Sequence, residues 1–120
     1  MTSATDQLGD ALVRRLHERT IASASALLEG RSRAPARQAI QSRLAELSET
    51  QKALVLDLVI QSSVSGLHDF LFYIQSEADA GKDGRVRLLV GASEPALDSD
   101  GLHGGLFGAD GWLERFGNKK

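Results

Sequence analysis

The sequence predicts a mainly α-helical chain with a small β element, an α+β fold in one domain. Apolar residues recur at helical spacing over most of residues 1–80, whereas residues 81–120 hold one alternating polar–apolar segment among glycine-rich turns. With 120 residues, 42% of them hydrophobic and 25% charged, the chain has the size and composition of a single globular domain. We therefore expect a three-helix bundle over 1–80, followed over 81–120 by a short β-hairpin and a Gly-rich C-terminal segment packed on it.

The first predicted helix has a cap at Ser3 or Thr5 and ends at Gly30. A serine or threonine side chain accepts a hydrogen bond from the first helical turn, and glycine adopts the left-handed conformation that ends a helix. Between these signals, one apolar stripe repeats at helical spacing. Its members are Leu8, Leu12, Leu16, Ile21, Ala24, Leu27 and Leu28. The spacing indicates an amphipathic helix with one face in the core.

Two more helices are predicted before residue 80. Pro35 fits the first turn of the second helix, because its missing N–H has no helical partner there. The apolar pattern of that helix ends near Leu47. Ser48 and Gln51 then match a capping box, in which each side chain bonds to the other residue's backbone N–H. The third helix is therefore predicted to start after Ser48 and to extend to Asp79.

The third predicted helix is apolar nearly all the way round over residues 53–74. Such a helix is surrounded by other elements of its chain or by a partner subunit. We expect it to be the centre of the core, with Leu56 and Phe70 buried. Asp57 and Asp69 interrupt the apolar run. Because charge is costly at a membrane midplane, the pattern favours a core helix over a membrane span.

The β-hairpin is predicted after residue 80. Residues 85–90 begin with the polar–apolar alternation of a strand, residues 91–94 have turn composition, and residues 95–98 form a short second strand. The tail from residue 98 onward holds half of the glycines of the chain and its single tryptophan. We expect the aromatic side chains to dock this tail onto the helices and Asp110 to cap a short helix there. The docking residues are Phe107, Trp112 and Phe116.

Four side chains of the tail are candidate metal ligands: Asp98, Asp100, His103 and Asp110. Carboxylates that alternate on a glycine-bearing loop supply the oxygens that a hard divalent cation requires, and a histidine suits a transition metal. The same Asp-Ser-Asp-Gly segment is also ordinary turn sequence, so a turn without metal is the alternative. A divalent metal is the one cofactor that the sequence suggests.

Two histidines, His68 in the third helix and His103 in the tail, are the candidate catalytic residues. If the tail folds over the helix, His68 meets His103 or Asp100. A histidine held by a carboxylate is the usual arrangement of a general base. The alternative for His68 is a core histidine bonded to a backbone carbonyl near a bend at Gly66.

Composition narrows the classes of function. Cysteine is absent, which excludes disulfides and cysteine nucleophiles, and a small domain without disulfides fits the cytoplasm. The formal net charge of −2 argues against nucleic acid as a partner. Arginines gather over residues 14–43, where a solvated helix face explains them and binding of an anionic ligand is the weaker alternative. Residues 1–6 have neither the basic nor the apolar part of a signal peptide.

These observations favour a small non-catalytic module that binds another protein or a second copy of itself, of a regulatory or toxin-neutralising type. The apolar helix, a strand edge and the aromatic tail each offer a contact surface, and obligate homodimers bury such surfaces. The alternative is a metal-dependent or acid–base enzyme that uses the His/Asp cluster of the C-terminal loop. We expect a cytoplasmic protein with neither a membrane nor a nucleic acid as partner.

Overall fold

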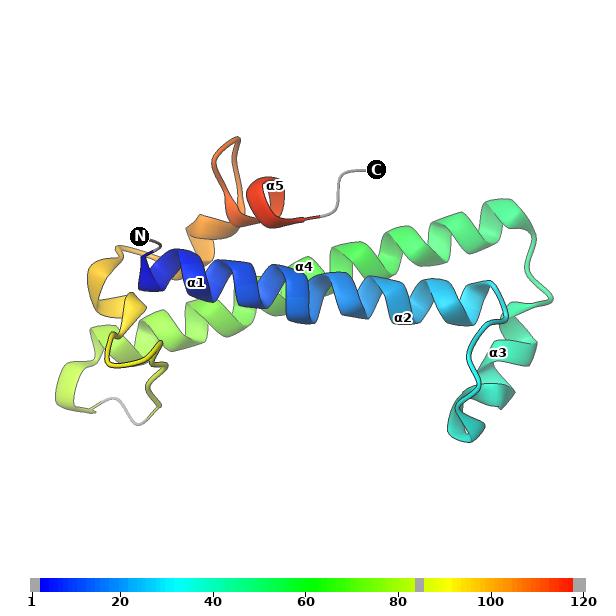
Figure 1. The fold of residues 1–120 in the computed structure, drawn as a ribbon, viewed down its shortest axis with the longest axis horizontal. Coiled ribbons are helices and arrows are strands. Elements are labelled where there is room, and N and C mark those ends of the chain that lie inside the picture. Colours follow the sequence, from blue (N-terminus) through cyan, green and yellow to red (C-terminus); the bar gives the residue numbers. More distant parts are fainter. Residues whose placement is uncertain (1–2, 84–85, 118–120) are drawn as a thin grey trace.

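Two long antiparallel helices form the body of the molecule (Figure 1). The computed structural model describes residues 3–83 and 86–117. The first long helix consists of α1 (Ala4–Ala11), the π-helical segment η1 (Leu12–His17) and α2 (Glu18–Leu28). The second is α4 (Glu49–Asp79), and the connection at one end of the pair contains η2 (Pro35–Arg37) and α3 (Gln38–Leu44). The molecule is elongated, with extents of 51 × 30 × 21 Å.

The caps predicted from the sequence set the helix starts. Ser3 Oγ accepts a hydrogen bond from the Asp6 N–H at 3.1 Å. At α4, Ser48 Oγ accepts from the Gln51 N–H at 3.1 Å while Gln51 Oε1 accepts from the Ser48 N–H at 2.9 Å. The predicted capping box is therefore confirmed. The middle helix ends at Leu44, slightly earlier than the apolar pattern indicates.

The predicted β-hairpin is absent from the described residues, so the α+β prediction is wrong. Residue 85, where the first strand was expected to begin, lies outside the described part of the chain. Over residues 86–93 the chain makes one isolated bridge, with hydrogen bonds of 2.8 and 3.0 Å between Val90 and Ser93. The expected second strand is instead the 3₁₀ helix η4 (Pro95–Asp98). Because the chain turns into a helix directly after one bridge, no ladder can extend from it.

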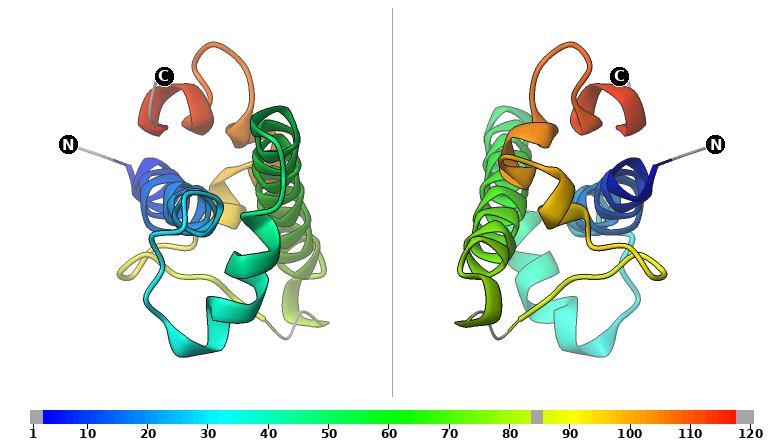
Figure 2. Two further views of the ribbon diagram at one scale, coloured as in Figure 1. Left: turned by 90° about the vertical axis from the view of Figure 1, so that its right-hand side faces the viewer. Right: turned by 90° about the vertical axis from the view of Figure 1, so that its left-hand side faces the viewer.

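Short helices make up the rest of the C-terminal segment: η3 (Gly81–Asp83), η5 (Leu102–Leu106) and α5 (Trp112–Phe116). η5 and α5 lie over one side of the two long helices, whereas residues 86–93 lie toward the opposite side, as the views along the long axis show (Figure 2). The predicted cap at Asp110 is wrong. The N-cap of α5 is Gly111, which makes no side-chain cap hydrogen bond.

Trp112 docks the C-terminal segment onto α1, as the sequence predicts. Its side chain is buried and lies directly over Gly9, where a Cβ atom would collide with the indole ring. An ion pair between Arg115 Nη2 and Asp6 Oδ1 at 3.0 Å joins the same two helices. Phe107, also expected to dock the tail, is instead half-exposed.

The core lies where the C-terminal half of α4, the first long helix and the C-terminal segment meet. Its buried members are Leu8, Val13, Leu67, Leu71, Ile74, Ala96, Leu102, Leu106 and Trp112. The expected core centre is therefore wrong in position: Leu56 is only partly buried and Phe70 is 41% exposed. The N-terminal half of α4 packs on α2, whose Ile21 and Leu28 are buried.

Gln75 of α4 is the polar centre of this core. Its side-chain Nε2 donates to Ala96 O at 2.9 Å, to Ser99 O at 3.1 Å and to Asp79 Oδ1 at 3.1 Å. Its Oε1 accepts from the Leu102 N–H at 2.9 Å. A buried side-chain amide with donor and acceptor both in use satisfies backbone groups that would otherwise be orphaned. The amide therefore fixes η4 and η5 to α4.

Replacing Gln75 with methionine should lower the free energy of unfolding by about 3 kcal/mol. Methionine keeps the volume but leaves the Leu102 N–H and the Ala96 carbonyl buried without partners, which is the costly way to lose hydrogen bonds. Urea denaturation followed by circular dichroism measures the change. Gln61→Met, at an exposed glutamine of the same helix, is the matched control and should leave the free energy of unfolding no lower. Equal stability of the Gln75→Met variant and the wild type would contradict this role.

Candidate functional site

One side of α4 carries apolar side chains that the described chain leaves uncovered. We define the outer face of α4 as the exposed residues Leu54, Leu58, Ser62, Ser65, Gly66, Asp69, Phe72 and Tyr73. Leu54 and Leu58 are 70% and 64% exposed, and Phe72 and Tyr73 are about half-exposed. Helical spacing places these positions along one side of the helix. The apolar exposure forms two pairs, one of leucines and one of aromatic residues, separated along the helix by Ser62, Ser65, Gly66 and Asp69. Isolated surface leucines are common, whereas exposed apolar groups gathered on one side of a helix mark a contact site.

The two long helices differ in the number of charged side chains that they expose. Between Lys52 and Glu77 the sequence of α4 contains only two charged side chains, Asp57 and Asp69. The exposed side of the first long helix is rich in arginine instead, with Arg14 ion-paired to an aspartate at 2.9 Å. A helix side that faces water normally carries charges, as the first long helix does. The outer face of α4 therefore has the composition of a covered surface without a cover in the described chain.

By length and composition alone, α4 is the one helix in the described part of the chain that could cross a membrane. Core helices of soluble proteins pass the same test, so this property is weak evidence for a membrane. One side of α4 packs on α2 and on the C-terminal segment. The expectation of a cytoplasmic protein without a membrane partner stays a prediction.

The structure brings the two candidate catalytic histidines together beside the outer face. The ring centroids of His68 and His103 lie 5.1 Å apart in an edge-to-face arrangement. The ring centroids of Phe72 and His103 are also 5.1 Å apart, and those of Phe107 and His68 are 6.3 Å apart. We call these four residues the histidine cluster. The aromatic partners were missed in the sequence, although Phe72 stands four residues after His68, the spacing that puts two side chains on one side of a helix.

Hydrogen bonding within the histidine cluster is incomplete. His68 Nδ1 lies 3.3 Å from Asp69 Oδ1, so the adjacent carboxylate does reach the ring from the neighbouring helical position. His103 Nδ1 is buried and has no hydrogen-bond partner. The carbonyl bond expected for a core His68 is not what the structure shows. The pair offers imidazole nitrogens, the groups used in proton transfer.

The candidate metal ligands are not gathered around one point. In the ranges 3–83 and 86–117, no group of three or more histidine, aspartate or glutamate side chains is placed to hold a metal ion. Asp98 ends η4, while Asp100 and Asp110 lie exposed on the loops around η5. Of the four candidates, only His103 meets another candidate site residue, His68. Metal binding by this loop rests on its sequence pattern alone.

The third histidine, His17, is buried and joins the two long helices. It ends the π-helical segment η1, and its Nδ1 lies 2.8 Å from Ser63 Oγ of α4. His17 was not predicted as a site residue, although it stands four residues after Val13 on the apolar side of its helix. Burial lowers the pKa of His17 below its usual value, and the nearby Glu18 carboxylate opposes this shift only in part.

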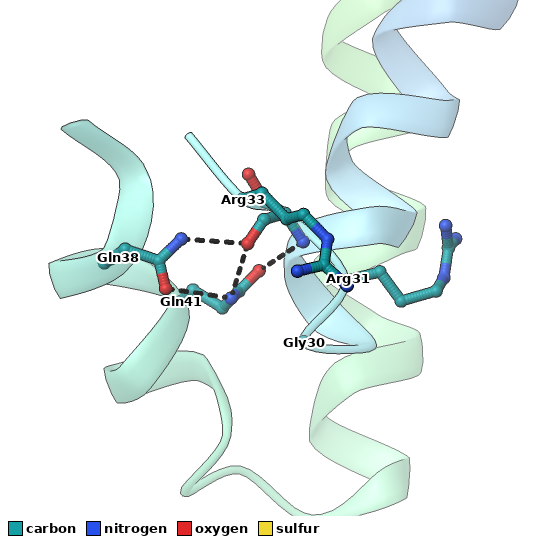
Figure 3. A pocket seen from close by; sticks show the side chains of 6 residues that line it. Gly30, Arg31, Arg33, Gln38 and Gln41 are labelled. Atoms are coloured by element: carbon teal, nitrogen blue, oxygen red, sulfur yellow. Dashed lines mark hydrogen bonds between the residues drawn. The ribbon is translucent and has the colours of Figure 1, made fainter. Parts of the chain in front are cut away.

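A polar cavity of about 760 Å³ lies between the end of α2 and α3 (Figure 3). Gln41 Oε1 accepts from the Ser32 N–H at 2.9 Å, and both Gln41 and Gln38 donate to Ser32 O. Arg31 extends away from the two glutamines and donates to Glu29 at 2.6 Å. These groups satisfy one another and hold the loop on α3. The cavity is thus explained by the loop itself, and binding of an anion by the N-terminal arginines stays a prediction.

Comparison with protein-family models, with curated proteins and with solved structures finds no match to this chain. The geometry of its own residues is therefore the basis for a functional proposal. Two features stand out from the packed core: the bare outer face of α4 and the histidine cluster at its border.

The stability of the protein should fall as the pH drops through the window just below 6.5. The unfolded chain protonates His17 near its usual pKa, whereas the folded chain holds that pKa lower. Below pH 6.5 the unfolded state therefore binds more protons, and the free energy of unfolding declines until the lowered pKa is passed. Well above pH 6.5 both states are neutral at this residue and the dependence disappears.

Urea denaturation between pH 5 and pH 7.5 measures this dependence. In a His17→Asn variant, which offers a nitrogen near the position of Nδ1 but does not titrate, the slope should be smaller than in the wild type. Carboxylates and the other histidines are common to both proteins and cancel in the comparison. Parallel curves for the two proteins would show that burial of His17 has no energetic consequence.

Proposed function

We propose that this chain is a small non-catalytic protein-binding module whose contact surface is the outer face of α4. The observation that carries the proposal is the exposure of Leu54 and Leu58 on a helix that is almost free of charge. Regulatory and toxin-neutralising proteins, the two roles expected from the sequence, both work through such surfaces.

A partner that covered the outer face would gain the free energy of burying its exposed apolar side chains. Full burial of a leucine or phenylalanine side chain stabilises by about 1.5–3 kcal/mol. Leu54, Leu58 and Phe72 leave most of that gain unrealised in the single chain. Interface cores are poor in charged residues and rich in aromatic ones, with a polar rim. Between Lys52 and Glu77, α4 has only two charged residues, Asp57 and Asp69. Phe72 and Tyr73 are the aromatic residues of the outer face.

A photo-reactive phenylalanine analogue in place of Leu58 should form one discrete covalent adduct when the full chain is irradiated in the cells that carry its gene. The same analogue at Leu97 is the matched control, because Leu97 is equally exposed (66% against 64%) but lies on η4, away from the outer face. Mass spectrometry of the adduct identifies the covering chain. No adduct at position 58, or the same diffuse adducts at both positions, would contradict the proposed function.

The contact between His68 and His103 favours one second candidate, an acid–base enzyme. Two imidazoles 5.1 Å apart between ring centroids, one with a buried and unpartnered nitrogen, are an arrangement that could exchange protons with a substrate. Turnover of chromogenic ester, phosphoester or glycoside probes should then be lost in both His68→Gln and His103→Gln, with circular dichroism spectra unchanged. Absence of turnover in the wild type, or turnover that survives both substitutions, would remove this candidate.

A further inference from the structure

Two glycines stand inside the long helices, and only one of them has a reason within the described chain. A glycine in a helix interior is less stable than alanine there, so its presence calls for a close neighbour. At Gly9 that neighbour is Trp112, whose ring occupies the place of a Cβ. At Gly66 a Cβ would meet nothing within 4 Å, and the position is exposed. Gly66 lies in the middle of the outer face of α4, together with Ser62 and Ser65.

The chain also exposes more surface than a monomer of its mass. Its accessible surface is 8123 Å², whereas the scaling for monomeric proteins gives about 6,300 Å² for 12.9 kDa. The radius of gyration is 17.2 Å, against about 14 Å for a compact domain of this length. The excess of about 1,800 Å² exceeds the ~800 Å² per chain that a standard stable interface buries. The elongated molecule therefore has enough surface to bury one such interface.

The outer face is also arranged to match a copy of itself. Two leucines, Leu54 and Leu58, lie on one side of the small residues around Gly66, and two aromatic residues, Phe72 and Tyr73, lie on the other. In a two-fold symmetric contact, each patch meets the complementary patch of the same surface. When two such helices cross antiparallel near Gly66, Leu58 of one copy lies close to the aromatic rings of the other, because these residues stand at similar distances from the crossing. The small residues at the crossing then let the two backbones approach closely.

We propose that a second copy of this chain covers the outer face of α4, with the two α4 helices packed antiparallel and crossing near Gly66. The inference rests on the proposed function and names its partner. It explains the bare surface, the low charge of α4 and the mid-helix glycine by one contact. The arginine-rich side of the first long helix stays in water on the outside of the dimer.

Light scattering and sedimentation equilibrium of the full chain from 1 to 200 μM test the proposal. The wild type should have twice the monomer mass of 12.9 kDa. Leu58→Glu should raise the dimer dissociation constant at least 100-fold, because it places a charge in the centre of an apolar contact. Leu97→Glu, the matched control on an equally exposed leucine, should leave the dissociation constant within about twofold of the wild-type value.

Gly66→Ala is the second variant and works even if Leu58→Glu fails to fold. In the proposed dimer the added methyl separates the two helices, so the dissociation constant should rise about tenfold and the melting temperature at 100 μM should fall. In a monomer the methyl stands in open water and alanine is the better helix residue, so the melting temperature should rise by about 3–6 °C instead. The sign of the shift thus distinguishes the two states.

A wild-type monomer at 200 μM overturns the second copy as partner, as does a dimer that survives both Leu58→Glu and Gly66→Ala. The proposed protein-binding function is decided by the cross-linking experiment, independently of self-association. A monomer whose residue 58 cross-links to one foreign chain keeps the protein-binding function and loses only the self-association. A monomer without any adduct at residue 58 loses both.

Discussion

The side chain of Gln75 is the contact on which the C-terminal third of the molecule depends. The described residues from 86 to 117 form short helical turns and one bridge, so they supply few backbone hydrogen bonds to one another. The amide of Gln75 replaces the missing sheet partner, since it accepts from the N–H of Leu102 and donates to the carbonyls of Ala96 and Ser99. Once these backbone groups are satisfied inside the core, Leu102 and Leu106 can be fully buried against α4.

Local signals could be predicted from the sequence, and contacts between distant residues could not. The capping box of Ser48 and Gln51 lies within four consecutive residues, and it was identified correctly. The alternation over 85–90 is an equally local signal, but it predicted a strand that does not form. Strand formation needs a partner strand, and here the chain turns after one bridge at Val90. What fixes the segment is Gln75, whose partners lie 21 to 27 residues further along the chain.

The candidate site shows the same division. The contact between His68 and His103 was one of two expected if the tail folded over the helix, and the structure contains it. Asp98, Asp100 and Asp110 were selected by a loop pattern that turns share with metal sites. The described residues do not gather them around one metal position. Apolar residues all round α4 indicated correctly that one neighbouring helix is not enough. The pattern could not tell which half of the helix the chain itself covers. That depends on where Gln75 and Trp112 anchor the C-terminal segment.

The uncovered half of α4 follows from this anchoring. The C-terminal segment is held at the end of the helix near Gln75, where His103 of η5 contacts Phe72, and α3 lies at the opposite end of the pair (Figure 1). Neither covers Leu54 or Leu58, which stay exposed. α2 shields only the inner side of the N-terminal half, where Ile21 and Leu28 are buried. If water were the permanent neighbour of Gly66, alanine would give a more stable helix there at no cost to the core. Because the described segments of the chain are anchored elsewhere, the proposed second copy is the cover that would bury these side chains.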